Sequence, residues 1–198
     1  MAENLNFKTD SSWWFRALDS ISHAEGGAMA VFDDSLGGGA RFGRYYQWHA
    51  AMGLPDSCLS HACSSSVQGV CPSGWHVPLD AEWRAFRPDS DSAGASARDS
   101  AIAEALRAVR GWEGLLPDGW KVEANGSDAY GFRAVHAGIM HGSDVFQSLG
   151  MDGWWETGSR APDPAVSAMY RGLDDGGLSL YEGIKRLALP GRCIEDLP

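Results

Sequence analysis

Glycine and proline interrupt this chain so often that turns and irregular connections must separate its helices and strands. The sequence holds 25 glycines and 9 prolines in 198 residues, which is many for a helical protein. Nine tryptophans, seven phenylalanines and five tyrosines supply large side chains for a core. A chain of this length can bury most of its apolar surface, so we expect a single domain over residues 1–198.

The net charge restricts the partners that the chain can take. It is −10 at pH 7, and such a surface repels phosphate backbones, so we expect no binding to nucleic acid. An acidic surface can attract cations or basic partners, and it also serves solubility alone. No apolar run approaches the roughly 20 residues that span a bilayer. No signal peptide is visible at the start, which by itself favours an intracellular protein.

The hydrophobic pattern predicts three helices in the first 110 residues. The first covers 43–52 and ends at Gly53. The second covers 81–87 and is capped by Asp80, and the third runs over about 97–110. The residues that share the face of the first helix are Tyr45, Trp48, His49 and Met52, and those that share the face of the third are Ile102, Leu106 and Val109.

Short strands are predicted mainly in the second half of the chain, with turn residues between them. One such turn is Asp-Asp-Gly-Gly at 174–177. The expected strands cover 28–32, 131–135, 169–173, 178–181 and 185–189. Since helices come first and short strands later, we expect an α+β fold in which two or three helices pack on mostly antiparallel strands joined by many loops.

The four cysteines leave several possibilities open. Cys58, Cys63, Cys71 and Cys193 can form two disulfides in three pairings, and free thiols are favoured if the chain is cytoplasmic. With His61, the first three could bind zinc, but C-x2-H-x-C is unusual spacing for structural zinc. The acidic pairs at 33–34 and 174–175 do not resemble an EF-hand loop. We therefore predict no metal ligand and no cofactor, and keep calcium as the one candidate.

Several segments resemble a single family, in that family's order. They are residues 1–6, 43–48 with 50–52, 71–78 with 82–83, 130–132, 137–138, 154–155 and 192–193. The family is the Fibrobacter succinogenes major paralogous domain family, and Cys-Pro-Ser-Gly-Trp-His-Val-Pro at 71–78 is the most specific block. The same block is similar to an element of formylglycine-generating-enzyme-like proteins. The resemblance spans nearly the whole chain.

This resemblance implies a C-type-lectin-like fold. It also implies disulfides between Cys71 and Cys193 and between Cys58 and Cys63 if the environment oxidises them, and a location at the cell surface or outside the cell. Relatives include the variable proteins of diversity-generating retroelements, in which a fixed scaffold carries rewritten surface residues near the C-terminus. Here the family's usual Ser/Asn/Tyr-rich tail is replaced by residues 156–164. His76, in the family block, is expected to be buried and hydrogen-bonded.

The candidate binding surface covers about residues 154–189. If Trp154 and Trp155 lie on a strand, one faces inward and the other outward. The outward ring, with Tyr170 and Tyr181, can form an aromatic floor, and the mixture of aromatic and charged residues resembles a paratope. The predicted ligand-binding residues are Trp155, Glu156, Thr157, Arg160, Tyr170, Arg171, Asp174, Asp175, Tyr181 and Glu182.

The sequence lacks the common signatures of catalysis, so we predict a protein that is not an enzyme. None of G-x-S-x-G, H-E-x-x-H and G-x-x-x-x-G-K-[ST] occurs, and no catalytic residue is assigned. The leading hypothesis is a module that binds an unknown protein or glycan, with the retroelement variable protein as a special case. The alternatives are an oxidoreductase related to the formylglycine-generating enzymes, which needs a redox-active cysteine pair or a metal, and a structural surface protein without a specific ligand.

Overall fold

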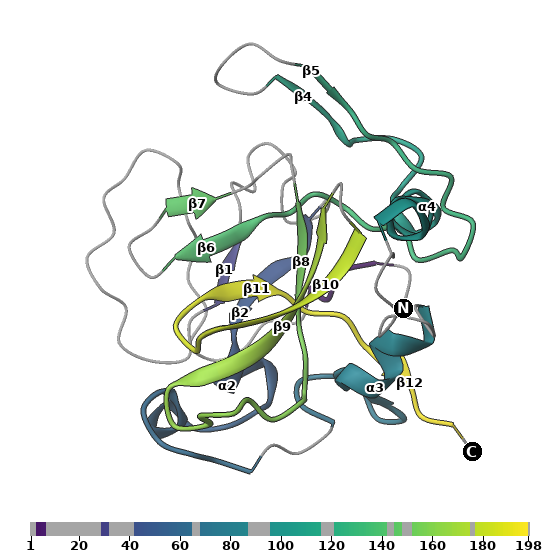
Figure 1. The fold of residues 1–198 in the computed structure, drawn as a ribbon. Coiled ribbons are helices and arrows are strands. Elements are labelled where there is room, and N and C mark those ends of the chain that lie inside the picture. The colour runs from purple at the N-terminus through teal and green to yellow at the C-terminus, as the bar shows by residue number, and fades with distance from the viewer. Residues whose placement is uncertain are drawn as a thin grey trace.

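The computed structural model describes residues 3–6, 29–31, 42–64, 68–86, 96–115, 121–141, 145–147, 152–174 and 177–197. Within these residues, strands outnumber helices, and all pairings between named strands are antiparallel. Figure 1 shows the strands crossing in the middle of the molecule, with the short helices at its periphery. The fold is therefore α+β with many connecting loops, as the sequence predicted.

The largest sheet joins segments from distant parts of the chain. Its strand order is β1-β2-β11-β6-β7. The bounds are β1 Met29–Val31, β2 Arg44–Gln47, β6 Ile139–His141, β7 Val145–Gln147 and β11 Ala188–Pro190. β11 pairs Leu189 with Tyr46 on one side and Ala188 with Met140 on the other. A late segment of the chain thus forms the centre of a sheet whose edge strand comes from residues near 30.

A second sheet carries most of the candidate binding segment. It consists of β8 Gly153–Glu156, β9 Ser167–Asp174 and β10 Gly177–Ile184, in the order β10-β9-β8. β9 and β10 form a hairpin that confirms the strands predicted at 169–173 and 178–181. Two smaller sheets pair β3 Trp75–His76 with β12 Ile194–Glu195, and β4 Glu113–Leu115 with β5 Lys121–Glu123. The β4–β5 hairpin extends away from the rest of the fold (Figure 1).

The helices are short. α2 spans Trp48–Ala51, α3 spans Asp80–Trp83 and α4 spans Ser96–Leu106. Turns of 3₁₀ helix cover Asp56–Leu59 and Arg84–Phe86. None of the helices in the described part of the chain is long and apolar enough to cross a bilayer.

The helix predicted at 43–52 is wrong for its first half, because Arg44–Gln47 form strand β2. Tyr45 and Tyr46 are both fully buried, since β2 lies inside the sheet and is covered on both faces. A strand followed directly by a helix produced spacings that fit a single helix. The predicted stop is correct, because Gly53 has φ +65°, a conformation that glycine adopts without strain.

Four other boundaries differ from prediction. Asp80 lies inside α3 rather than capping it; the N-cap is Leu79, whose N–H donates to the Glu82 carboxylate at 2.8 Å. α4 ends at Leu106, so Val109 is 59% exposed. Residues 131–135 form no strand. The strand predicted at 185–189 begins only at Ala188, as β11, because 185–186 form a turn. The prediction at 28–32 is confirmed for Met29–Val31, and positions 28 and 32 lie outside the described residues.

The β8–β9–β10 sheet lies between two hydrophobic clusters. Tyr170 packs into one cluster, together with Tyr46, Trp48, Met52 and Leu189. Trp155 and Leu173 pack into the other, whose further members include Trp83, Leu106, Trp112 and Leu178. Since residues i and i+1 of a strand point to opposite faces, this sheet contributes buried side chains in both directions. A third cluster, which includes Tyr45 and Met140, fills the space beside the five-stranded sheet.

Candidate functional site

An aromatic pair forms the outward part of the β8–β9–β10 sheet. The rings of Trp154 and Tyr181 lie 4.7 Å apart between centroids, and Tyr181 is 37% exposed. Trp154 is half-buried, whereas Trp155 beside it is fully buried. This arrangement agrees with the prediction that one of the two tryptophans faces inward and the other contributes to an aromatic floor with Tyr181.

The contact between Trp154 and Tyr181 depends on a glycine that lies next to both rings. In register, Gly172 of β9 lies next to Trp154 of β8. A Cβ at Gly172 would lie 2.8 Å from Cε2 of Tyr181 and 3.0 Å from Cζ3 of Trp154, so any other residue would push the rings apart. Sequence reasoning missed Gly172, although a glycine inside a predicted strand is a signal for close approach.

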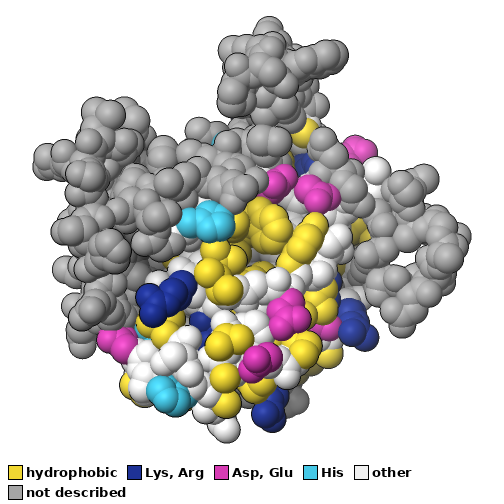
Figure 2. Space-filling model, turned by 60° about the vertical axis from the view of Figure 1, so that its left-hand side comes forward, with side chains coloured by type: hydrophobic (Ala, Val, Ile, Leu, Met, Phe, Trp, Pro, Cys, Tyr) yellow, Lys and Arg dark blue, Asp and Glu magenta, His cyan; other side chains and the backbone are white. Residues whose placement is uncertain are grey.

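Acidic side chains lie near the Trp154–Tyr181 pair. The hydroxyl of Tyr181 donates to Oδ2 of Asp174 at 3.4 Å. Partial burial raises the pKa of Tyr181, and the negative charges of Asp174 and Asp152 raise it further. Asp174 was predicted and is half-buried; Asp152 was not predicted, and Asp175 lies outside the described residues. Figure 2 shows one face of the molecule on which hydrophobic side chains gather with acidic side chains among them.

Further side chains of strand β10 are also exposed. Leu180 and Ile184 are 37% and 57% exposed, and Glu182 between them accepts a hydrogen bond from Oγ of Ser167 at 2.6 Å. Arg160 is exposed as well. Of the predicted binding residues, Arg160, Tyr181 and Glu182 therefore lie on the surface.

Five predicted binding residues lie inside the protein, which corrects the sequence prediction. They are Trp155, Glu156, Thr157, Tyr170 and Arg171. Their polar atoms serve internal contacts: the indole N–H of Trp155 donates to Oδ1 of Asn4 at 3.0 Å, and the hydroxyl of Tyr170 donates to the carbonyl of Ile184 at 2.8 Å. Arg171 forms an ion pair with Asp80 of α3. Because both faces of the sheet carry a packed cluster, alternation alone does not make these side chains surface residues.

Glu156 is the exception among the buried polar residues. Among the residues that the structure describes, neither of its carboxylate oxygens has a hydrogen-bond partner, and the side chain is fully buried. Burial raises the pKa of Glu156 well above its usual value, so the fold favours the neutral form of this carboxyl.

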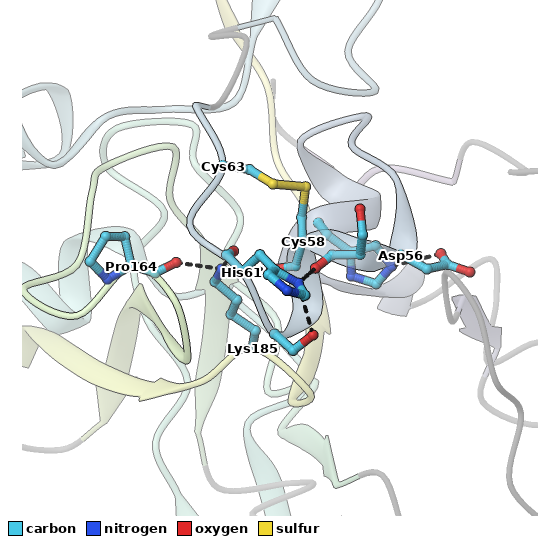
Figure 3. Close-up of a disulfide and its surroundings, with 9 residues drawn as sticks. Asp56, Cys58, His61, Cys63, Pro164 and Lys185 are labelled. Atoms are coloured by element: carbon cyan, nitrogen blue, oxygen red, sulfur yellow. Dashed lines mark hydrogen bonds and ion pairs between the residues drawn. A yellow bond between two sulfur atoms is a disulfide. The ribbon is translucent and has the colours of Figure 1, made fainter.

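The Cys58–Cys63 disulfide lies over a buried lysine (Figure 3). The ammonium of Lys185 donates to the carbonyls of Cys58, His61 and Pro164, at 2.7, 2.9 and 2.5 Å. It also lies 4.9 Å from the centroid of the Trp48 ring. Burial lowers the pKa of Lys185, against the opposing charge of Asp163. These contacts attach the end of the β9–β10 hairpin to the disulfide loop.

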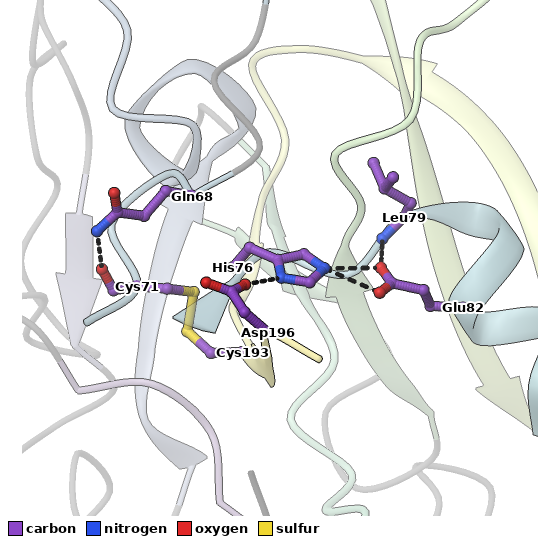
Figure 4. A network of polar contacts seen from close by, with 7 residues as sticks. All are labelled: Gln68, Cys71, His76, Leu79, Glu82, Cys193 and Asp196. Atoms are coloured by element: carbon purple, nitrogen blue, oxygen red, sulfur yellow. Dashed lines mark hydrogen bonds and ion pairs between the residues drawn. A yellow bond between two sulfur atoms is a disulfide. The ribbon is translucent and has the colours of Figure 1, made fainter. Parts of the chain in front are cut away.

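The Cys71–Cys193 disulfide and a histidine hold the C-terminal segment (Figure 4). His76 lies between two carboxylates, with Nδ1 2.5 Å from Asp196 and Nε2 2.9 Å from Glu82. Burial opposes the charged imidazole, but the hydrogen bonds with Asp196 and Glu82 outweigh it and raise the pKa of His76. His76 is hydrogen-bonded as expected but only partly buried, and both disulfides have the pairing that the resemblance implied.

The cysteines are not arranged for metal binding. Cys58, Cys63 and Cys71 are all in disulfides, so the zinc set proposed with His61 does not form. Among the residues that the structure describes, no three His, Cys, Asp or Glu side chains are grouped so as to hold a metal ion. Asp33 and Asp34 lie outside them.

Comparison with known proteins places the chain in one family. A family model described as the Fibrobacter succinogenes major domain matches residues 1–194. Neither the curated proteins nor the solved structures gave a match. Because the family model covers almost the whole sequence, the chain belongs to the Fibrobacter succinogenes major domain family.

Proposed function

We propose that this protein is a non-enzymatic binding module with a C-type-lectin-like fold, which holds a protein or glycan ligand on the outward side of its β8–β9–β10 sheet. The observation that carries the proposal is the contact between the half-buried Trp154 and the exposed Tyr181, whose rings both lie close to Gly172. Exposed Trp and Tyr are the residue types that dominate binding energy at interfaces. They also lose little conformational entropy when they bind.

The support beneath this surface is rigid, which favours tight binding because little has to be ordered on association. The hairpin is attached to α3 through Arg171 and Asp80, and to the disulfide loop through Lys185. The two disulfides support a location at the cell surface or outside the cell, where such bonds persist.

We further propose that the protein is the variable protein of a diversity-generating retroelement. The exposed residues of the hairpin can change without altering the two hydrophobic clusters, whereas the buried ones cannot. Diversified positions are then expected at Leu180, Tyr181, Glu182 and Ile184, and not at Trp155, Glu156, Tyr170 or Arg171. The test is the neighbouring DNA, which should encode a reverse transcriptase and a template repeat matching the 3′ end of this gene; their absence would rule out this part of the proposal.

Binding itself is tested with a matched pair of tyrosine variants. A ligand is first selected on glycan and protein arrays. Tyr181→Ala should then weaken its binding by tenfold or more, about 1.4 kcal/mol, and leave the melting temperature within about 2 °C of the original. Tyr130→Ala, which removes an exposed tyrosine elsewhere, should change neither quantity.

Two outcomes contradict the proposal. If Tyr181→Ala and Tyr130→Ala bind the selected ligand equally well, the aromatic floor is not the site. If the arrays yield no saturable ligand, the alternative of a structural surface protein takes its place.

A further inference from the structure

Strand β10 forms one edge of the β10-β9-β8 sheet. Among the strands that the structure describes, it pairs with β9 alone (Figure 1). In an antiparallel pair, the backbone groups of alternate residues point to the partner strand, and those of the residues between them point away. The N–H of Lys185, directly after β10, donates to the carbonyl of Val166 at 3.3 Å, which fixes this alternation. The odd-numbered residues of β10 therefore bind β9, and the backbone groups of the even-numbered ones point outward.

The outward backbone groups of Leu180 and Glu182 have no partner. Neither the N–H nor the carbonyl of these two residues forms a hydrogen bond within the part of the chain that the structure describes. Both side chains are exposed. By contrast, Leu178 is buried beside α4, and the carbonyl of Ile184 accepts the N–H of Leu187. The open part of the edge thus offers two donors and two acceptors, over residues 180–182.

Strand β10 lacks the features that usually keep the edge of a sheet from pairing. Such features are a short strand, a proline, a lysine or a bulge. β10 has eight residues, its sequence Gly-Leu-Ser-Leu-Tyr-Glu-Gly-Ile contains neither proline nor lysine, and its register with β9 runs without interruption. Its one charged residue is Glu182. This edge is therefore suited to pairing with another extended segment.

Charge decides which extended segment fits. The carboxylate of Glu182 accepts a hydrogen bond from Oγ of Ser167 and forms no ion pair with any residue that the structure describes. Two further acidic residues, Asp152 and Asp174, act on the nearby Tyr181. A second copy of the chain would bring another net charge of −10 and another Glu182 to this edge, which is unfavourable. A basic residue opposite Glu182 would instead form a cross-strand ion pair.

We propose that an extended peptide segment with a basic residue adds to the edge of β10 as a fourth strand of this sheet. Its backbone pairs with Leu180 and Glu182, its basic side chain lies opposite Glu182, and its next side chain lies on the face of Tyr181. Backbone hydrogen bonds supply affinity, and the side chains select among peptides. This inference rests on the proposed function and names the ligand as an extended peptide of a protein partner; a glycan is the competing outcome.

Amide hydrogen exchange followed by NMR tests the edge directly. In the free protein, the N–H groups of Leu180 and Glu182 should exchange at least about tenfold faster than those of Tyr181 and Gly183, which point to β9. The probe is a capped pentapeptide, Thr-Val-Lys-Val-Thr, and at saturation it should slow both exposed amides about tenfold. The same peptide with methylated internal amide nitrogens keeps its side chains but cannot donate the backbone hydrogen bonds, so it should give no protection.

Two variants at one position separate backbone from side chain. Leu180→Pro and Leu180→Ala both remove the leucine side chain, but only proline removes the outward N–H, and an edge strand tolerates proline where its N–H faces solvent. Leu180→Pro should bind the pentapeptide about tenfold more weakly than Leu180→Ala does. Glu182→Lys should reverse the preference for charge, so that the pentapeptide with glutamate in place of lysine binds better than the original one.

Three results would overturn the inference: protection of Leu180 and Glu182 in the free protein, no protection by the pentapeptide, or equal protection by its methylated form. If Leu180→Pro does not fold, the comparison of the two peptides decides. A ligand selected on the arrays that needs Tyr181 but leaves the exchange of Leu180 and Glu182 unchanged, as a glycan would, also overturns it and leaves the proposed function standing. If instead the pentapeptide protects the edge while Tyr181→Ala binds the selected ligand normally, the aromatic floor fails and the edge does not.

Discussion

Neighbouring residues of the β8–β9–β10 sheet differ in burial more than their sequence suggests. Trp154 and Trp155 are neighbours, yet Trp155 is enclosed by Trp83 and Phe132 while Trp154 pairs with the exposed Tyr181. Lys185 and Arg186 are neighbours too, one buried and one exposed. The comparison teaches that in this segment buried and exposed side chains are adjacent in sequence, so the chemistry of the surface can change while the scaffold remains.

The largest effect is expected for the tryptophan pair. Trp155→Ala removes a fully buried ring and should lower the free energy of unfolding by about 4 kcal/mol, whereas Trp154→Ala should lower it by about 1.5 kcal/mol. Denaturant unfolding of the two variants measures both values. Equal losses would mean that the two sides of the strand are not distinct in energy.

The next effect concerns the basic pair at the end of the hairpin. Lys185→Ala leaves three carbonyls, one buried and two part-buried, without this donor and should cost about 3 kcal/mol. Arg186→Ala changes an exposed side chain and should cost less than about 0.5 kcal/mol. Thermal unfolding under conditions that keep the disulfides intact compares the stabilities of the two variants. If Lys185→Ala is as stable as Arg186→Ala, the contacts of Lys185 do not hold the hairpin to the disulfide loop.

A smaller effect is expected at the glycine beneath the aromatic floor. Gly172→Ala places a Cβ against the rings of Trp154 and Tyr181 and should cost about 1 kcal/mol. It should also reduce binding of the selected ligand, because the two rings separate. Near-ultraviolet circular dichroism reports the change in aromatic packing, and a spectrum identical to that of the unaltered protein would contradict the close approach.

The smallest effect is a pH dependence of stability, which is expected for Glu156 but not for Glu182. Since burial raises the pKa of Glu156 above 4.5, the folded state binds this proton more tightly than the unfolded state, and stability falls as pH rises above 4.5 towards the folded pKa. Glu156→Gln removes this loss, so its advantage in unfolding free energy should grow with pH and vanish below about pH 4. Glu182→Gln, at an exposed position, should show no such trend across the same series of unfolding measurements.

Local pattern was enough for several features of the candidate site. The two hairpin strands at 169–173 and 178–181 were predicted because the turn residues at 174–177 separate two short segments that contain apolar and aromatic residues, and the β9–β10 hairpin lies there. The opposite orientation of Trp154 and Trp155 followed from the period of two along a strand. The pairing of the cysteines was implied by the family resemblance alone, since four cysteines allow three pairings.

Other features depend on contacts that no local pattern contains. Arg171 is buried because Asp80, 91 positions earlier, lies beside it, and Trp155 is buried because Asn4, 151 positions earlier, accepts its N–H. A pocket with an aromatic wall likewise brings together residues of α3, residues 130–132 and residues 192–194. The first half of the helix predicted at 43–52 was wrong for the same reason: β2 exists because β11 and β1 pair with it.

By itself, the sequence determined the α+β class, the family, the hairpin and the alternation of side chains along it, because these follow from short-range spacing and turn chemistry. Only the tertiary structure decided which side chains on each face of the sheet are covered by other segments. For this reason Trp154 and Tyr181 contribute to the surface, while Glu156, Tyr170 and Arg171 do not. The physical reason is that a strand presents two faces, and whether each one is buried depends on packing against segments far away in the chain.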